Sequence, residues 1–87
     1  MATYQVFLDQ PVADGWQSLK RRFPTHYIVG NNTAFIHADD TTMIRDICDV
    51  LGMNNHNDKR GFVIEVYNQR INGWYSQSLW EWIGKHD

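Results

Sequence analysis

The sequence lacks the features that cross-link small proteins or insert them into membranes. It has one cysteine, Cys48, among 87 residues, which excludes an intramolecular disulfide. No apolar run approaches the roughly 20 residues that a membrane-spanning helix needs, so we expect no membrane partner. The N-terminus has no basic segment followed by an apolar run, which predicts a cytoplasmic protein without a signal peptide.

Positive charge is also scarce. The chain has eight Lys and Arg residues and ten Asp and Glu residues, so its net charge is −2. The overall field therefore does not attract RNA or DNA, and such binding needs a local patch. The basic residues that form short runs are Lys20, Arg21, Arg22, Lys59 and Arg60. These runs predict a phosphate-contacting patch beside the start of the last strand, with a solvated helix face as the simpler alternative.

Aromatic residues are abundant by contrast, at 14% of a chain that is 43% hydrophobic. This composition predicts one folded domain over residues 1–87 rather than a disordered tail. A domain of this size has little interior for so many rings. We therefore expect some of them at an interface.

Apolar periodicity and turn residues predict a simple order of elements. The predicted elements are a strand over 3–9, a helix over 15–23, strands over 25–29 and 33–38, a helix over 44–51, a strand over 61–67 and a helix from 76. This β-α-β-β-α-β order is typical of an α+β ferredoxin-like sandwich, here with an extra aromatic C-terminal helix. Right-handed crossovers place the first strand between the third and the fourth in an antiparallel sheet.

The sheet has a helix-covered face and an open face. Tyr4, Val6 and Leu8 alternate on the covered side of the first strand. The residues predicted on the open face are Gln5, Phe7, Phe35, His37, Val63, Glu65 and Tyr67. This face is too apolar to be left in water. We expect a homodimer through it, and the alternative is that the aromatic tail folds over it.

The pattern Tyr4-x-Val6-x-x-Asp9 resembles the N-terminus of the small CRISPR-associated endoribonuclease family. The segments TAFIHADDTTMIRDICDVLG and NGWYSQSLWEWIGKH are similar to SinR-like relatives of that fold, and GhoS-type antitoxins and VapD endoribonucleases share the layout. The resemblance implies a homodimer in which Asp9 approaches its symmetry mate and a divalent metal to cleave RNA or DNA, in a toxin–antitoxin or phage-defence setting. The chain departs from the family by continuing into a Trp-rich helix instead of a fifth strand.

Asp9, at the end of the first strand, has two interpretations. As a catalytic residue it would bind Mg²⁺, which takes oxygen ligands and keeps several waters. As a structural residue it would accept backbone hydrogen bonds in the turn at Gln10 and Pro11. His37 and Glu65 share its predicted face, but antiparallel pairing places His37 near the opposite end of the first strand.

Two functions follow from these observations. The first is a metal-dependent nuclease or nucleic-acid-binding protein that uses Asp9 and the basic runs. The second is a non-enzymatic module that binds another protein with the same dimer scaffold. The net negative charge, the aromatic surplus and the acidic pair Asp39 and Asp40 suit the second function better.

Overall fold

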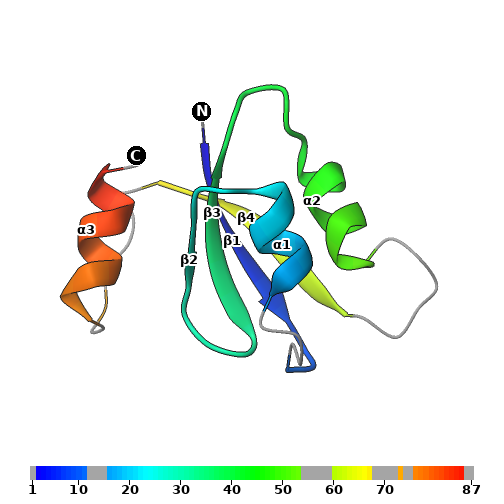
Figure 1. Ribbon diagram of the computed structural model, residues 1–87, viewed down its shortest axis with the longest axis horizontal. Helices are drawn as coiled ribbons and strands as arrows, with labels where there is room; N and C mark the ends of the chain where they lie inside the picture. Colours follow the sequence, from blue (N-terminus) through cyan, green and yellow to red (C-terminus); the bar gives the residue numbers. More distant parts are fainter. Residues whose placement is uncertain (1, 12–15, 54–59, 68–72, 74–75, 86–87) are drawn as a thin grey trace.

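The computed structural model describes residues 2–11, 16–53, 60–67, 73 and 76–85, which form a small α+β domain (Figure 1). In chain order the elements are β1 (Ala2–Leu8), α1 (Gln17–Arg22), β2 (His26–Ile28), β3 (Thr33–Ala38), α2 (Ile44–Leu51), β4 (Gly61–Val66) and α3 (Gln77–Lys85). Among the residues described, no helix combines the length and the apolar character needed to cross a membrane.

The four strands form one antiparallel sheet in the order β2-β3-β1-β4. The predicted position of the first strand between the third and the fourth is confirmed. At the centre of the sheet, Val6 of β1 lies opposite Ala34 of β3 on one side and opposite Val63 of β4 on the other. Strands β2 and β4 are therefore the two edges.

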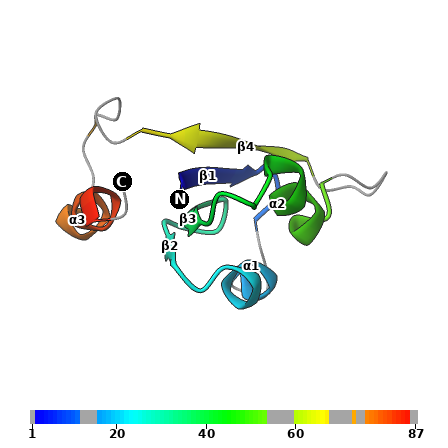
Figure 2. The same ribbon diagram turned by 90° about the horizontal axis from the view of Figure 1, so that it is seen from above.

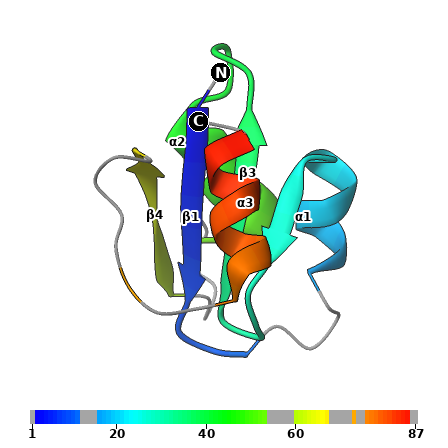
Figure 3. The same cartoon turned by 90° about the vertical axis from the view of Figure 1, so that its left-hand side faces the viewer.

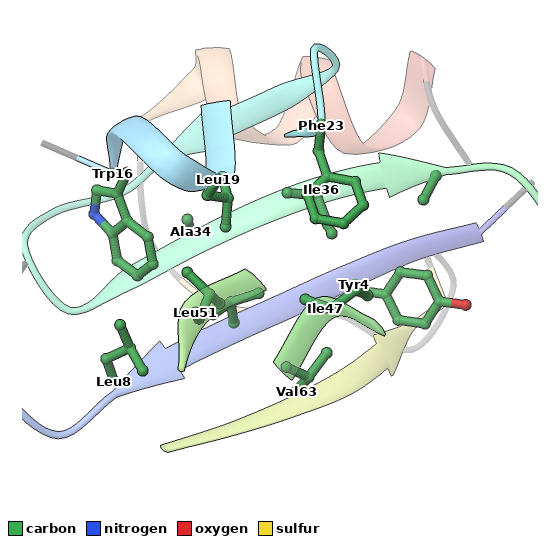
Figure 4. Close-up of a cluster of buried hydrophobic side chains, with 12 residues drawn as sticks. Tyr4, Leu8, Trp16, Leu19, Phe23, Ala34, Ile36, Ile47, Leu51 and Val63 are labelled. Carbon is green, nitrogen blue, oxygen red and sulfur yellow. The ribbon is translucent and has the colours of Figure 1, made fainter. Parts of the chain in front are cut away.

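The main core lies between the sheet and the helices α1 and α2, which cover the same face (Figure 2). Alternate residues of β1 and β3 point into this core because successive side chains of a strand face opposite ways. The buried members of the main core are Tyr4, Val6, Leu8, Trp16, Leu19, Phe23, Ala34, Ile36, Ala38, Ile47, Leu51 and Val63 (Figure 4). This confirms the predicted inward set of β1.

Helix α1 begins later than predicted, at Gln17 instead of residue 15. Trp16 precedes it in a left-handed conformation, with φ of 67°, and is only 2% exposed. Its Nε1–H donates a hydrogen bond of 2.7 Å to the carbonyl oxygen of Gly30 in the turn between β2 and β3. The start of α1 is thus fixed by a buried side chain. The earlier start was predicted because Asp14 and Gln17 form a capping-box pattern, and Asp14 lies outside the described residues.

Helix α3 packs on the opposite face of the sheet (Figure 3). Leu79 and Ile83 of α3 bury Phe35 of β3 in a second cluster, separate from the main core. The expectation that Phe35 contacts a second subunit is therefore wrong, because α3 of the same chain covers it. The alternative, in which the aromatic tail folds over the open face, holds for this part of the sheet.

The predicted faces of β4 are reversed. The register places Val63 opposite Val6 and Glu65 opposite Tyr4. Directly opposed residues of an antiparallel pair share a face, so Val63 and Glu65 lie on the helix-covered side. The expectation that Glu65 belongs to the open face is wrong. Both alternating sets of β4 contain large apolar side chains, so periodicity alone cannot choose between them.

Candidate functional site

The predicted catalytic residue Asp9 lies where β1, β4 and the turn between β2 and β3 meet. Its backbone N–H donates to the carbonyl oxygen of Arg60, at 2.7 Å. The side-chain amide of Asn32 donates to the carbonyl oxygens of Leu8, at 2.8 Å, and of Asp9, at 3.3 Å. These bonds hold the backbone at Asp9 from two sides, while its side chain is exposed.

The structure places the two basic runs on different elements. Arg60 directly precedes β4 and is held beside Asp9, whereas Lys20 and Arg21 are exposed on α1. Helix α1 runs back from the Asp9 end of β1 toward the other end of the sheet (Figure 1). Arg22, the last residue of α1, places its guanidinium 5.1 Å from the ring centre of Phe23. Lys59 lies outside the described residues.

His37 lies far from Asp9, at the other end of β1, as antiparallel pairing predicts. It is opposite Thr3 in the register, and its Nδ1 is 3.0 Å from the Thr3 hydroxyl. Its backbone N–H donates to the carbonyl oxygen of Thr25, at 3.0 Å. His37 therefore has structural partners on neighbouring strands and does not join a site with Asp9.

The fit of Asp9 to Mg²⁺ is incomplete within one chain. Among the described residues there is no group of three His, Cys, Asp or Glu side chains that would hold a metal ion. The neighbour of Asp9 across the ladder is Arg60, a cation. Magnesium usually takes one or two carboxylates with several waters and substrate phosphates. Asp9 thus offers one such ligand, and the rest must come from a second copy or from a nucleic acid.

Glu65, predicted to share the open face with Asp9, instead lies near the hydroxyl of Tyr4. Burial raises the pKa of Tyr4, and the nearby carboxylates of Glu65 and Asp40 raise it further. This acidic corner is on the helix-covered side of the sheet. Tyr67, also predicted at the interface, follows the end of β4 and is half exposed.

The open face keeps an uncovered apolar surface along β1 and β4, which we call the β4 strip. Its residues are the apolar Phe7, Phe62 and Ile64 and the polar Gln5. Phe62 is 49% exposed and Ile64 is 46% exposed. Phe7 lies opposite Phe62, and their rings stack with centres 5.1 Å apart. Phe62 and Ile64 were missed in the sequence because the faces of β4 were reversed. A cross-strand pairing of Phe7 with Phe62 is the signal that favours the correct register.

The β4 strip borders an edge of the sheet. In an antiparallel ladder, alternate residues hydrogen-bond to the neighbouring strand. Since Asp9 and Arg60 are a bonded pair, Phe62, Ile64 and Val66 direct their backbone groups toward β1. The backbone groups of Gly61, Val63 and Glu65 then point away from the sheet. No strand among the described residues pairs with this outer side.

The position of Gly61 is restricted by close contact with β1. A Cβ atom at this position would lie 2.0 Å from the backbone carbonyl oxygen of Phe7. No real side-chain carbon approaches a backbone oxygen so closely. Glycine is therefore required for β4 to start this near to β1.

Helix α3 is held on the open face by polar contacts with β2 as well as by its own apolar side. The hydroxyl of Tyr27 lies 3.2 Å from that of Ser76 and 2.5 Å from that of Ser78. Hydrogen bonds from Ser76 and Ser78 lower the pKa of Tyr27. Trp82 of α3 lies near the ring of Tyr27, with centres 6.2 Å apart. These contacts fix α3 over β2 and β3 and leave the β4 strip uncovered.

The fold and the site thus define a small α+β domain with an apolar strip at one sheet edge and an exposed carboxylate at the end of β1. Comparison with protein-family models, with curated proteins and with solved structures finds no match to this chain.

Proposed function

We propose that the chain is a ferredoxin-like domain that binds a protein through the β4 strip. The observation that carries this proposal is the exposure of Phe62 and Ile64 beside Phe7 at a strand edge. Clustered apolar side chains in water mark surfaces that bind other proteins. An unpaired strand edge adds backbone donors and acceptors to the same surface. The β-α-β-β-α-β order supports the ferredoxin-like part of the proposal.

The charges favour a protein partner over a nucleic acid. The net charge is −2, and the exposed basic residues of α1 are on a different element from Arg60. A nucleic-acid site needs several cations that neutralise neighbouring phosphates. Apolar side chains, in contrast, lose unfavourable hydration on any protein surface that covers them.

The proposal is tested with a double substitution in the strip, Phe62→Ser with Ile64→Ser. We expect it to abolish the protein cross-links that the wild-type chain forms through this surface, both when purified and in cells. The reason is that serine removes the exposed apolar groups that would make the contact. The matched control is Met43→Ser with Ile44→Ser, since these residues are 60% and 42% exposed but lie at the start of α2, away from the strip. Cross-linking followed by mass spectrometry measures the result. The proposal would be contradicted if both variants lost the cross-links to the same extent, or if both kept them.

A second function, a metal-dependent nuclease, is favoured by one observation: Asp9 and Arg60 are held side by side at the end of β1. A carboxylate for Mg²⁺ next to a cation for phosphate is an arrangement that suits phosphodiester cleavage. The resemblance to CRISPR-associated endoribonucleases supports RNA or DNA as the substrate, in a defence or toxin–antitoxin setting. This function requires a second copy or the substrate to complete the metal site.

The nuclease is tested with Asp9→Asn. We expect cleavage of RNA or DNA in Mg²⁺ to fall by more than about tenfold, because loss even of an outer partner of a metal site typically costs 10- to 100-fold. Glu81→Gln is the control, since it removes one negative charge from the exposed side of α3, where Glu81 accepts a hydrogen bond from Gln77. If the wild-type chain cleaves nothing with Mg²⁺ or Mn²⁺, the nuclease proposal is wrong.

A further inference from the structure

We infer that the protein bound at the β4 strip is a second copy of this chain, with the two β4 strands paired edge to edge and antiparallel. The four strands of each copy then form one continuous sheet. This inference rests on the proposed function, because it names the partner of the same surface. It differs from a dimer in which two open sheet faces stack on each other.

The backbone of β4 is prepared for such pairing. Gly61, Val63 and Glu65 direct their N–H and carbonyl groups away from β1, as the bonded pair of Asp9 and Arg60 requires. β4 (Gly61–Val66) also contains neither proline nor lysine, the residues that commonly protect an edge. The other edge, β2 (His26–Ile28), has only three residues and lies next to α3. A short strand offers few backbone groups to a partner, so β4 is the edge open to pairing.

One register of the two β4 strands gives hydrogen-bond partners to more of the outward-pointing backbone N–H and carbonyl groups than any other. Place the two-fold axis at Val63. Gly61 then pairs with Glu65 of the second copy, Val63 pairs with Val63 of the second copy, and Glu65 pairs with Gly61 of the second copy. Each pair exchanges two hydrogen bonds, so this register forms about six of them. A shift by two residues in either direction pairs fewer outward groups and forms about four.

The same register also matches the side chains. It places Phe62 opposite Ile64 of the second copy, twice, on the open face. These are non-hydrogen-bonded pairs, whose side chains approach most closely. Each Glu65 faces Gly61, so like charges are not opposed and no side chain obstructs the carboxylate. Charge, shape and hydrogen bonding therefore select one arrangement, which is complementary to itself.

This dimer separates the two copies of Asp9. Arg60 lies opposite Val66 of the second copy, an offset of about 20 Å along the strands. The two β1 strands are three strand spacings apart, about 14 Å. The Asp9 carboxylates are then about 25 Å apart by these spacings and do not share a metal ion. The edge dimer and a metal site shared across the two-fold axis are mutually exclusive.

The register is tested by mixing two single-cysteine chains, one Phe62→Cys and the other Ile64→Cys, both with Cys48→Ala. One carries a tag, so that the two chains differ in mass. We expect the mixed Phe62→Cys/Ile64→Cys disulfide to form in at least about tenfold excess over either same-residue disulfide, because the opposed Cα atoms lie within disulfide reach. Same-residue disulfides in equal or greater yield, or no disulfide at all, would overturn the inference.

The strand edge is tested separately with Glu65→Pro. Proline removes an N–H that points away from β1, so the ladder with β1 keeps its donors. We expect the wild-type chain to sediment at twice its 10.3 kDa mass. Glu65→Pro should weaken that association more than about tenfold, because each copy loses a hydrogen-bond donor. Glu65→Ala keeps the N–H and should stay dimeric. Circular dichroism checks that all variants fold.

The outcomes separate the inference from the proposed function. If the strip variant Phe62→Ser with Ile64→Ser abolishes association and Glu65→Pro does not, the strip binds a protein but the edge pairing is wrong. If the wild-type chain is a monomer and yet forms strip-dependent cross-links to another protein, the inference alone is wrong. If the strip variant changes neither association nor cross-linking, the proposed function is wrong as well.

Discussion

Replacing Trp16 with alanine should destabilise the protein by about 3–5 kcal/mol, because truncating a fully buried tryptophan leaves a large cavity. Trp16 is 2% exposed and packs in the main core beside Leu19 and Ala34 (Figure 4). Alanine also leaves the carbonyl oxygen of Gly30 without the indole donor. Small domains have only about 5–15 kcal/mol of stability in total, so this variant should lie close to unfolding.

Urea denaturation followed by circular dichroism measures this loss. Trp16→Phe is the matched variant, since it keeps an aromatic ring and removes the hydrogen bond to Gly30. We expect it to cost less than Trp16→Ala, with about 0.5–1.5 kcal/mol from the lost hydrogen bond, because Gly30 is exposed and water can bond to its carbonyl oxygen. A loss of less than about 1 kcal/mol for Trp16→Ala would show that the indole does not anchor the start of α1.

Replacing Ile83 with alanine should release α3 from the sheet while the rest of the domain stays folded. Ile83 is 1% exposed, and among the described residues the buried members of the second cluster are Phe35, Leu79 and Ile83. Truncating a buried isoleucine costs about 2–5 kcal/mol. A cluster of this size supplies little more than that, so α3 should detach without unfolding the main core.

Hydrogen exchange, measured amide by amide, distinguishes this local opening from global unfolding. In Ile83→Ala we expect the amides of α3 to lose protection and those of β1 and β3 to keep it. Ile47→Ala is the matched control, because it removes the same atoms from a side chain that is 0% exposed in the main core. It should reduce protection throughout the sheet. If Ile83→Ala lowers protection in β1 as much as in α3, the two clusters unfold together.

The order of elements and of strands could be predicted from the sequence because local patterns determine both. Tyr4, Val6 and Leu8 alternate with more polar residues, so only one side of β1 suits a core. The position of His37 near the start of β1 followed from antiparallel pairing alone. The position of Asp9 at the end of β1, just before Pro11, followed from the strand pattern, and the structure shows its side chain to be exposed.

The faces of β4 and the docking of α3 could not be predicted, because each depends on contacts between distant residues. In β4 the apolar residues Phe62 and Ile64 compete with Val63 for the core, and the ladder with β1 decides in favour of Val63. For the open face, the sequence led us to expect a second subunit, with the aromatic tail as the alternative. The structure shows that the tail covers Phe35 and leaves Phe62 exposed.

The start of α1 shows how tertiary packing overrides a local signal. A capping box at Asp14 and Gln17 predicted a helix that begins near residue 15. The helix begins instead after Trp16, whose burial and bond to Gly30 hold it in a left-handed conformation. Such a conformation costs a non-glycine residue about 1–2 kcal/mol, which burial of the indole ring outweighs.

The crowding at Gly61 has an evolutionary consequence. On one side of this residue the carbonyl oxygen of Phe7 leaves no room for a side chain. On the other, the proposed edge pairing would set it against Glu65 of a second copy, where a larger residue would displace the carboxylate. Two independent pressures would then act on a single codon, one from the monomer fold and one from assembly. A lineage that lost the dimer would still have to keep this glycine, whereas the neighbouring Phe62 would be free to become polar.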